Sequence, residues 1–201
     1  MRIVIIILLT SFSLKVYGQD KKHDIKLKRV KLEVIVNNDK KEVSDTIFYS
    51  IQRPLDWNDF LGKPKSDSKN AAVSFTGFGY QASIALRNDT LSLKIKIDVY
   101  FQKSASWVLS SYREDYFLAH EQLHFDIARI AAEDFKNKLL ARDDYSYQDA
   151  DSIMQYEYLE AYRGLNKLQE LYDTETRHGL DKEAQAIWQK RIKENIKKII
   201  K

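Results

Sequence analysis

The strongest constraint on the fold is the stretch of residues 111–140, which contains neither proline nor glycine. It predicts one long helix, and Ser111 followed three residues later by Glu114 predicts a capping box at its start. Stepping about 100° per residue places His120, His124 and most apolar residues in one arc of the helix. The sequence therefore predicts a helix that turns both histidines toward a core.

The two histidines belong to the pattern His120-Glu121-Gln122-Leu123-His124. Residues four apart lie one above the other on a helix, so two imidazoles at this spacing can bind one metal ion. Glu121 stands next to them, where its carboxylate can reach a metal-bound water, as in zinc hydrolases. Two core histidines with satisfied hydrogen bonds are the structural alternative. Asp126 lies on the opposite side of the helix and is expected to face solvent.

The residues before this helix show the alternation of β-strands, most clearly over residues 91–101. Weaker strand patterns cover residues 25–36, 45–51, 71–80 and 81–86, and Asn88-Asp89 predicts a turn. Asp56 is expected to cap a single helical turn that carries Trp57 and Phe60 to the core.

Two more amphipathic helices are expected after the motif helix. The first begins at Asp149 or Asp151 and ends near Tyr172, and the second covers residues 182–201. The predicted fold class is therefore α+β, with an N-terminal antiparallel β-sheet followed by the motif helix and C-terminal helices.

The strand over residues 91–101 directly precedes the motif helix, and two roles are open for it. It is either a half-buried structural strand or a strand that lines a cleft and pairs with the backbone of an extended peptide.

Residues 1–18 have the pattern of a secretory signal peptide, with Arg2, an apolar run from Ile3 to Leu9, and cleavage after Gly18. The apolar run is too short to span a membrane, and an uncleaved N-terminal anchor is the alternative. We expect residues 19–201 to form a single domain that is secreted or periplasmic, without stable insertion into a membrane.

The composition excludes several classes of function. Cleavage removes Arg2 and Lys15 and no acidic residue, which lowers the formal net charge from +4 to +2 and gives no reason to expect a nucleic-acid partner. The absence of cysteine excludes disulfides, thiolate zinc ligands and a cysteine nucleophile.

Catalytic zinc usually takes three protein ligands and one water, so a third ligand is needed. Ile127 and Ile130 occupy the next helical turns, which excludes a ligand there. Glu157 and Glu160 on the following helix are candidates or ordinary surface acids. The helix break at residues 172–179 contains three further candidates, which are Asp173, Glu175 and His178.

Four pieces of the sequence carry a resemblance to a known family. They are Arg53-Pro-Leu-x-Trp57-x-Asp59-Phe60-x-Gly62-x-Pro64, Ser106-Trp107, the His120–His124 motif, and Tyr172-Asp173-x-x-Thr176-x-His178-Gly179. With them the chain resembles the bacterial family catalogued as domain of unknown function 922, described as predicted secreted zinc-dependent proteases. The resemblance implies a zincin-like fold and a place for residues 172–179 beside the motif helix. The order for the third ligand is then His178, Asp173, Glu175.

The expected function is that of a secreted zinc metallopeptidase acting on a peptide or protein. Zn²⁺ is held by His120, His124 and His178, and Glu121 is the general base for the zinc-bound water. Tyr172 or Arg177 could stabilise the oxyanion. A non-catalytic exported module with structural or metal-binding histidines remains an alternative, as does a metal-dependent amidase acting on a non-protein substrate.

Overall fold

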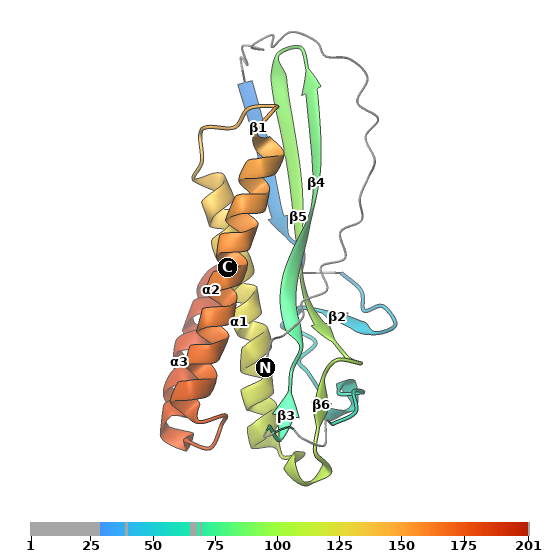
Figure 1. Cartoon of the computed structure of the whole chain (residues 1–201), viewed down its shortest axis with the longest axis vertical. Helices are drawn as coiled ribbons and strands as arrows, with labels where there is room; N and C mark the ends of the chain where they lie inside the picture. The colour runs from blue at the N-terminus through green and yellow to red at the C-terminus, as the bar shows by residue number, and fades with distance from the viewer. Residues whose placement is uncertain (1–28, 39, 65–67, 69, 201) are drawn as a thin grey trace.

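The computed structural model describes residues 29–38, 40–64, 68 and 70–200. The predicted signal peptide and the first residues of the first predicted strand lie outside this part. The described residues form a β-sheet and three long helices, which confirms the α+β class (Figure 1). No helix in these ranges is both long enough and apolar enough to cross a membrane.

The main sheet is built around β5 (Thr90–Gln102). β4 (Thr76–Arg87) pairs with one edge of β5 in the antiparallel direction. On the other edge, β1 (Arg29–Val36) runs parallel to the first part of β5, and β2 (Thr46–Phe48) runs antiparallel to its end. The prediction of a purely antiparallel sheet is therefore wrong for β1. β4 carries the chain back to the end of the sheet where β1 begins, so that β5 can run parallel to β1.

The strand prediction for residues 91–101 is confirmed, and its structural role is the correct one. Both edges of β5 are paired, so its backbone has no free edge for a substrate. One face of β5 is fully inside the core, through Leu91, Leu93, Ile95, Ile97, Val99 and Phe101.

The hairpin between β4 and β5 turns at Asn88 and Asp89, as predicted. Both residues have left-handed φ values, 47° and 59°, which suit the tight turn of a two-residue hairpin. Residues 76–87 form one strand rather than the end of one and the whole of another. The preceding residues form β3 (Ala72–Val73), which pairs with β6 (Trp107–Val108) in a small second sheet.

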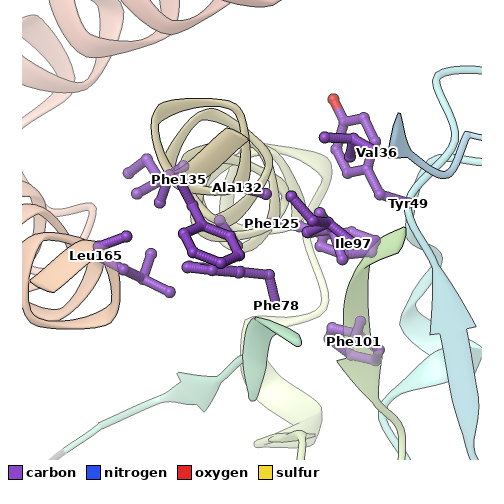
Figure 2. Packing of buried hydrophobic residues seen from close by; sticks show 14 of the residues in the cluster. Val36, Tyr49, Phe78, Ile97, Phe101, Phe125, Ala132, Phe135 and Leu165 are labelled. Carbon is purple, nitrogen blue, oxygen red and sulfur yellow. The ribbon is translucent and has the colours of Figure 1, made fainter. Parts of the chain in front are cut away.

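The motif helix α1 (Asp115–Leu140) packs against the sheet and also against α2 (Ala150–Thr176) and α3 (Lys182–Ile199). Figure 2 looks along α1, with Leu165 of α2 on one side and residues of the sheet on the other. Phe135 of α1 packs against Phe78 of β4, with 5.9 Å between ring centroids. The helix therefore lies inside the molecule rather than at its surface.

The side of α1 that was predicted to face solvent is covered. Asp126 accepts hydrogen bonds from Tyr49 Oη at 3.0 Å and from Gln122 Nε2 at 2.9 Å. Arg129 is only 2% exposed and pairs with Glu133. The residues around Tyr49 form this cover, and a helical wheel of α1 alone contains no information about it.

The start of α1 also differs from its prediction. Ser111 belongs to a short 3₁₀ helix, η2 (Ser110–Tyr112), and α1 begins after Glu114, whose side chain makes no capping hydrogen bond. The predicted capping box is therefore absent.

The predicted helical turn near Trp57 is present as η1 (Trp57–Asp59), capped by Asp56. Arg53 donates two hydrogen bonds to the carboxylate of Asp59, at 2.9 and 2.7 Å. The backbone N–H of Leu55 donates to Gln122 Oε1 at 2.8 Å. This segment therefore holds α1 through Gln122, in the turn that contains the two histidines.

Candidate metal centre

Three ligand atoms converge between α1 and the last turns of α2. His120 Nε2 lies 3.3 Å from Asp173 Oδ1, and His124 Nε2 lies 3.0 Å from the same oxygen. Both histidines are buried, and the Asp173 side chain is partly exposed. Within the described ranges, this is the one group of three His, Cys, Asp or Glu residues with ligand atoms close enough to hold a metal ion together.

The other nitrogen of each histidine faces a glutamine side chain. His120 Nδ1 lies 2.9 Å from Gln185 Oε1, and His124 Nδ1 contacts Gln169 Oε1. Because an amide oxygen only accepts hydrogen bonds, both Nδ1 atoms must donate. The Nε2 atoms of neutral rings then turn their lone pairs toward the Asp173 carboxylate. Only a cation between them, a proton or a metal ion, makes this arrangement favourable.

The charges around the centre also favour a cation between the two rings and Asp173. Burial opposes ionisation of Asp173, but hydrogen bonds from His120 and His124 outweigh it and hold the Asp173 pKa well below its usual range. Burial likewise lowers the pKa of His124, but the bond to Asp173 and the charges of Asp173 and Glu121 raise it by more. The Asp173 carboxylate is therefore ionised, and a cation between it and the two rings, a proton or a metal ion, is favoured.

Tyr172 packs against the ring of His120. Its ring stacks on the imidazole with 4.6 Å between centroids, and its hydroxyl lies 2.8 Å from Nδ1 of His120 and 2.9 Å from Gln185 Oε1. Burial raises its pKa, so it stays a neutral phenol. The Tyr172 side chain is 0% exposed, so it cannot reach an oxyanion on a substrate.

Gln169 links His124 to the sheet. Its Nε2 donates to Thr76 Oγ1 at 3.1 Å, and Thr76 Oγ1 donates to the backbone oxygen of His124 at 3.3 Å. One amide therefore binds both the metal-facing histidine and the first residue of β4.

The turn after α2 closes the centre. Gly179 has φ +80°, and a Cβ atom there would lie 3.3 Å from two ring atoms of His120. Its carbonyl accepts a hydrogen bond from Tyr116 at 2.8 Å, and Thr176 Oγ1 donates to the backbone oxygen of Tyr172 at 2.8 Å. Glycine allows the turn to pack directly on the imidazole face.

Glu121 is buried next to this group, and its charge is among those that raise the pKa of His124. Its carboxylate makes no hydrogen bond or ion pair with another residue that the structure describes. It is therefore available to a molecule bound at the centre.

The structure separates the sequence-level candidates for the third ligand. Asp173 lies with the two histidines, whereas His178 lies outside the group, with its side chain 64% exposed and its Nδ1 3.6 Å from Asp173 Oδ2. Glu175 accepts a hydrogen bond from Trp188 Nε1 at 2.7 Å, and Glu157 pairs with Arg142 at 2.6 Å.

Sequence reasoning missed the polar supports of the centre, which are Thr76, Gln169 and Gln185. One signal was available, because Gln169 precedes Asp173 by four residues and so shares its face of α2. For Thr76 and Gln185 no local pattern exists, since each comes from another element.

No protein-family model, curated protein or solved structure matches this chain.

Proposed function

We propose that the chain is an exported zinc-dependent metallopeptidase in which His120, His124 and Asp173 hold the metal. The observation that carries this is the convergence of both Nε2 atoms on Asp173 Oδ1 while both Nδ1 atoms are held by glutamines. Two imidazoles and one carboxylate are a ligand set that catalytic zinc takes with a water in the fourth position. This geometry favours Asp173 over His178 as the third ligand.

Zinc bound here would supply an acidified water and a polarised carbonyl oxygen. Glu121 is the base that takes the water proton as the oxygen–carbon bond forms, and it later delivers this proton to the leaving amine as the carbon–nitrogen bond breaks. Its carboxylate has no competing partner among the described residues. In α1 it directly follows His120, three residues before His124.

A free strand edge beside the centre favours a peptide substrate. The backbone oxygens of Ala71 and Phe75 accept from Leu109 and Gln102, so residues 71, 73 and 75 turn toward β5 and β6. By strand alternation, the backbone groups of Ala72 in β3 and Thr76 in β4 point away from them. In the part of the chain that is described, those groups have no hydrogen-bond partner.

This edge begins at the centre, because the Thr76 side chain bonds to the backbone of His124. At Phe78 it is closed, since the Phe78 carbonyl accepts from Tyr158 Oη at 3.1 Å. An unpaired edge of this length can bind an extended peptide through main-chain hydrogen bonds. The edge over residues 72–76 therefore takes the role that was considered for residues 91–101.

The test is digestion of a peptide library by purified residues 19–201 loaded with zinc. We expect cleavage by the parent, none by Glu121→Gln with unchanged zinc content, and normal cleavage by Glu114→Gln, a matched change on an exposed residue. Full activity in Glu121→Gln would refute the mechanism. Bound zinc without hydrolysis of any peptide would favour a non-catalytic module, and cleavage of cell-wall amides alone would favour the amidase.

Export, and membership of the family that the sequence resembles, are parts of this proposal that depend on sequence patterns. The predicted signal peptide, residues 1–18, lies outside the described part. Recovery of the chain from the periplasm or medium of a bacterial host, with a new N-terminus at Gln19, is the expected result.

A further inference from the structure

Several side chains of the segment from Tyr172 to Gly179 support the centre, but that of His178 is exposed. Tyr172 supports His120, and Asp173 faces both histidines. Thr176 Oγ1 donates to the backbone oxygen of Tyr172, and Gly179 packs on the His120 ring. The imidazole of His178, by contrast, is 64% exposed and takes no part in the core.

The backbone at His178 is nevertheless held in an unusual conformation. Arg177, His178 and Gly179 have successive φ values of 52°, 55° and 80°, and side chains other than glycine rarely adopt this region. The N–H of His178 donates to the backbone oxygen of Asp173 at 2.8 Å, and the next carbonyl is held by Tyr116. This turn ends α2 and brings Gly179 onto the His120 ring, and it also fixes where the side chain of His178 leaves the backbone.

The position of the His178 ring relative to Asp173 indicates what it does. Asp173 Oδ1 faces the two motif histidines, and Asp173 Oδ2 faces His178 Nδ1 at 3.6 Å. The contacts of the two motif histidines with Asp173 are to Oδ1, and the contact of His178 is to Oδ2. A small movement of the ring would let Nδ1–H donate to Oδ2.

We propose that His178 is a positioning residue that holds Oδ2 of Asp173 and so directs Oδ1 at the metal, without binding the metal itself. Groups that hydrogen-bond to metal ligands in this way fix ligand orientation, and their loss typically weakens metal binding about 10- to 100-fold. The inference rests on the metal centre of the proposed function, but not on peptide hydrolysis.

The experiment measures zinc affinity by competition with a chelator, for purified residues 19–201 and three variants. His178→Ala removes the donor. His178→Asn keeps an N–H donor close to the position of Nδ1, and asparagine tolerates positive φ. Arg177→Asn is the control for the turn, because it changes the neighbouring left-handed residue and leaves His178 in place.

We expect His178→Ala to retain one binding site per chain with affinity about 10- to 100-fold weaker, and His178→Asn and Arg177→Asn to stay within about threefold of the parent. Complete loss of zinc in both His178 variants would make His178 a ligand and overturn the proposal. Parent-like affinity of His178→Ala would also overturn it, while leaving the metal centre intact. If the parent binds no zinc, the proposed function fails together with this inference.

Discussion

At the scale of single residues, the two glutamines decide which nitrogen of each histidine faces the metal position. Gln169 and Gln185 each present an amide oxygen to Nδ1, so that Nε2 of each ring faces the Asp173 carboxylate. We predict that Gln169→Leu weakens zinc binding about 10- to 100-fold in a chelator competition, because His124 loses the partner that fixes its tautomer. Gln169→Glu keeps an acceptor and should retain most of the affinity.

Gln155 offers a matched control on the same helix, because among the described residues its side chain bonds to Asp151 alone, away from the centre. Gln155→Leu should leave zinc affinity unchanged. An equal loss in Gln155→Leu and Gln169→Leu would mean that the leucine acts through α2 in general, and not through His124.

Two glycines should respond to alanine with opposite signs. Gly179→Ala places a Cβ 3.3 Å from the His120 ring at φ +80°, so we predict a loss of at least about 1–2 kcal/mol in the free energy of unfolding. Gly164 lies inside α2 with nothing within 4 Å of a Cβ, and Gly164→Ala should gain about 0.5–1 kcal/mol. Urea unfolding measures both, and the same sign in the two variants would contradict this account.

The sequence pattern singled out His120, Glu121 and His124, and it included Asp173 among five candidates for a third ligand. It could not rank Asp173 above His178, because that depends on where α2 ends. The pattern suggested an end at Tyr172, whereas α2 continues to Thr176 and keeps Asp173 in helical register with Gln169. Gly179 indicated a break in this region, but the left-handed residues before it, Arg177 and His178, are not glycine, so the sequence did not show that α2 continues to Thr176.

At the scale of elements, α1 is stabilised by a buried polar contact between Tyr49 and Asp126. Tyr49 Oη donates to Asp126, and burial raises the pKa of Asp126. We predict that Tyr49→Phe lowers the free energy of unfolding by about 1–2 kcal/mol, because a buried carboxyl loses a hydrogen bond. Tyr147→Phe, at an exposed position, should change it by less than about 0.5 kcal/mol. Equal effects in chemical denaturation would show that the Tyr49–Asp126 contact contributes no stability.

The elements themselves were largely readable from local patterns. The hairpin turn at Asn88-Asp89, the alternation of β5 and the caps at Asp56 and Asp181 all have local causes. The parallel pairing of β1 with β5 has no local cause, because the two strands are more than fifty residues apart in the chain. The burial of Arg129 has none either, because it depends on the neighbouring layers of the fold.

At the scale of the whole molecule, folding should become less favourable in acid, partly through the segment behind α1. Burial opposes ionisation of Asp59, but hydrogen bonds from Arg53 outweigh it and lower the Asp59 pKa. A carboxyl with a lowered folded-state pKa contributes stability above its unfolded pKa, and this contribution is lost as the pH falls through the folded value.

We therefore predict that metal-free Asp59→Asn is less stable than the metal-free parent at about pH 6, and that the difference shrinks toward about pH 3. Denaturant unfolding at a series of pH values measures it. A difference that stays constant over this range would show that the Asp59 charge does not contribute through its titration.

The whole fold brings Asp173 from the end of α2 to two histidines of α1, and the most direct test of the proposed metal site is a zinc measurement. Purified residues 19–201 would be supplied with zinc, dialysed and assayed for metal beside Asp173→Ala and Glu121→Gln. We predict about one zinc per chain in the parent and in Glu121→Gln, and none retained by Asp173→Ala. Zinc retained by Asp173→Ala at the parent level, or absent from the parent, would contradict the account.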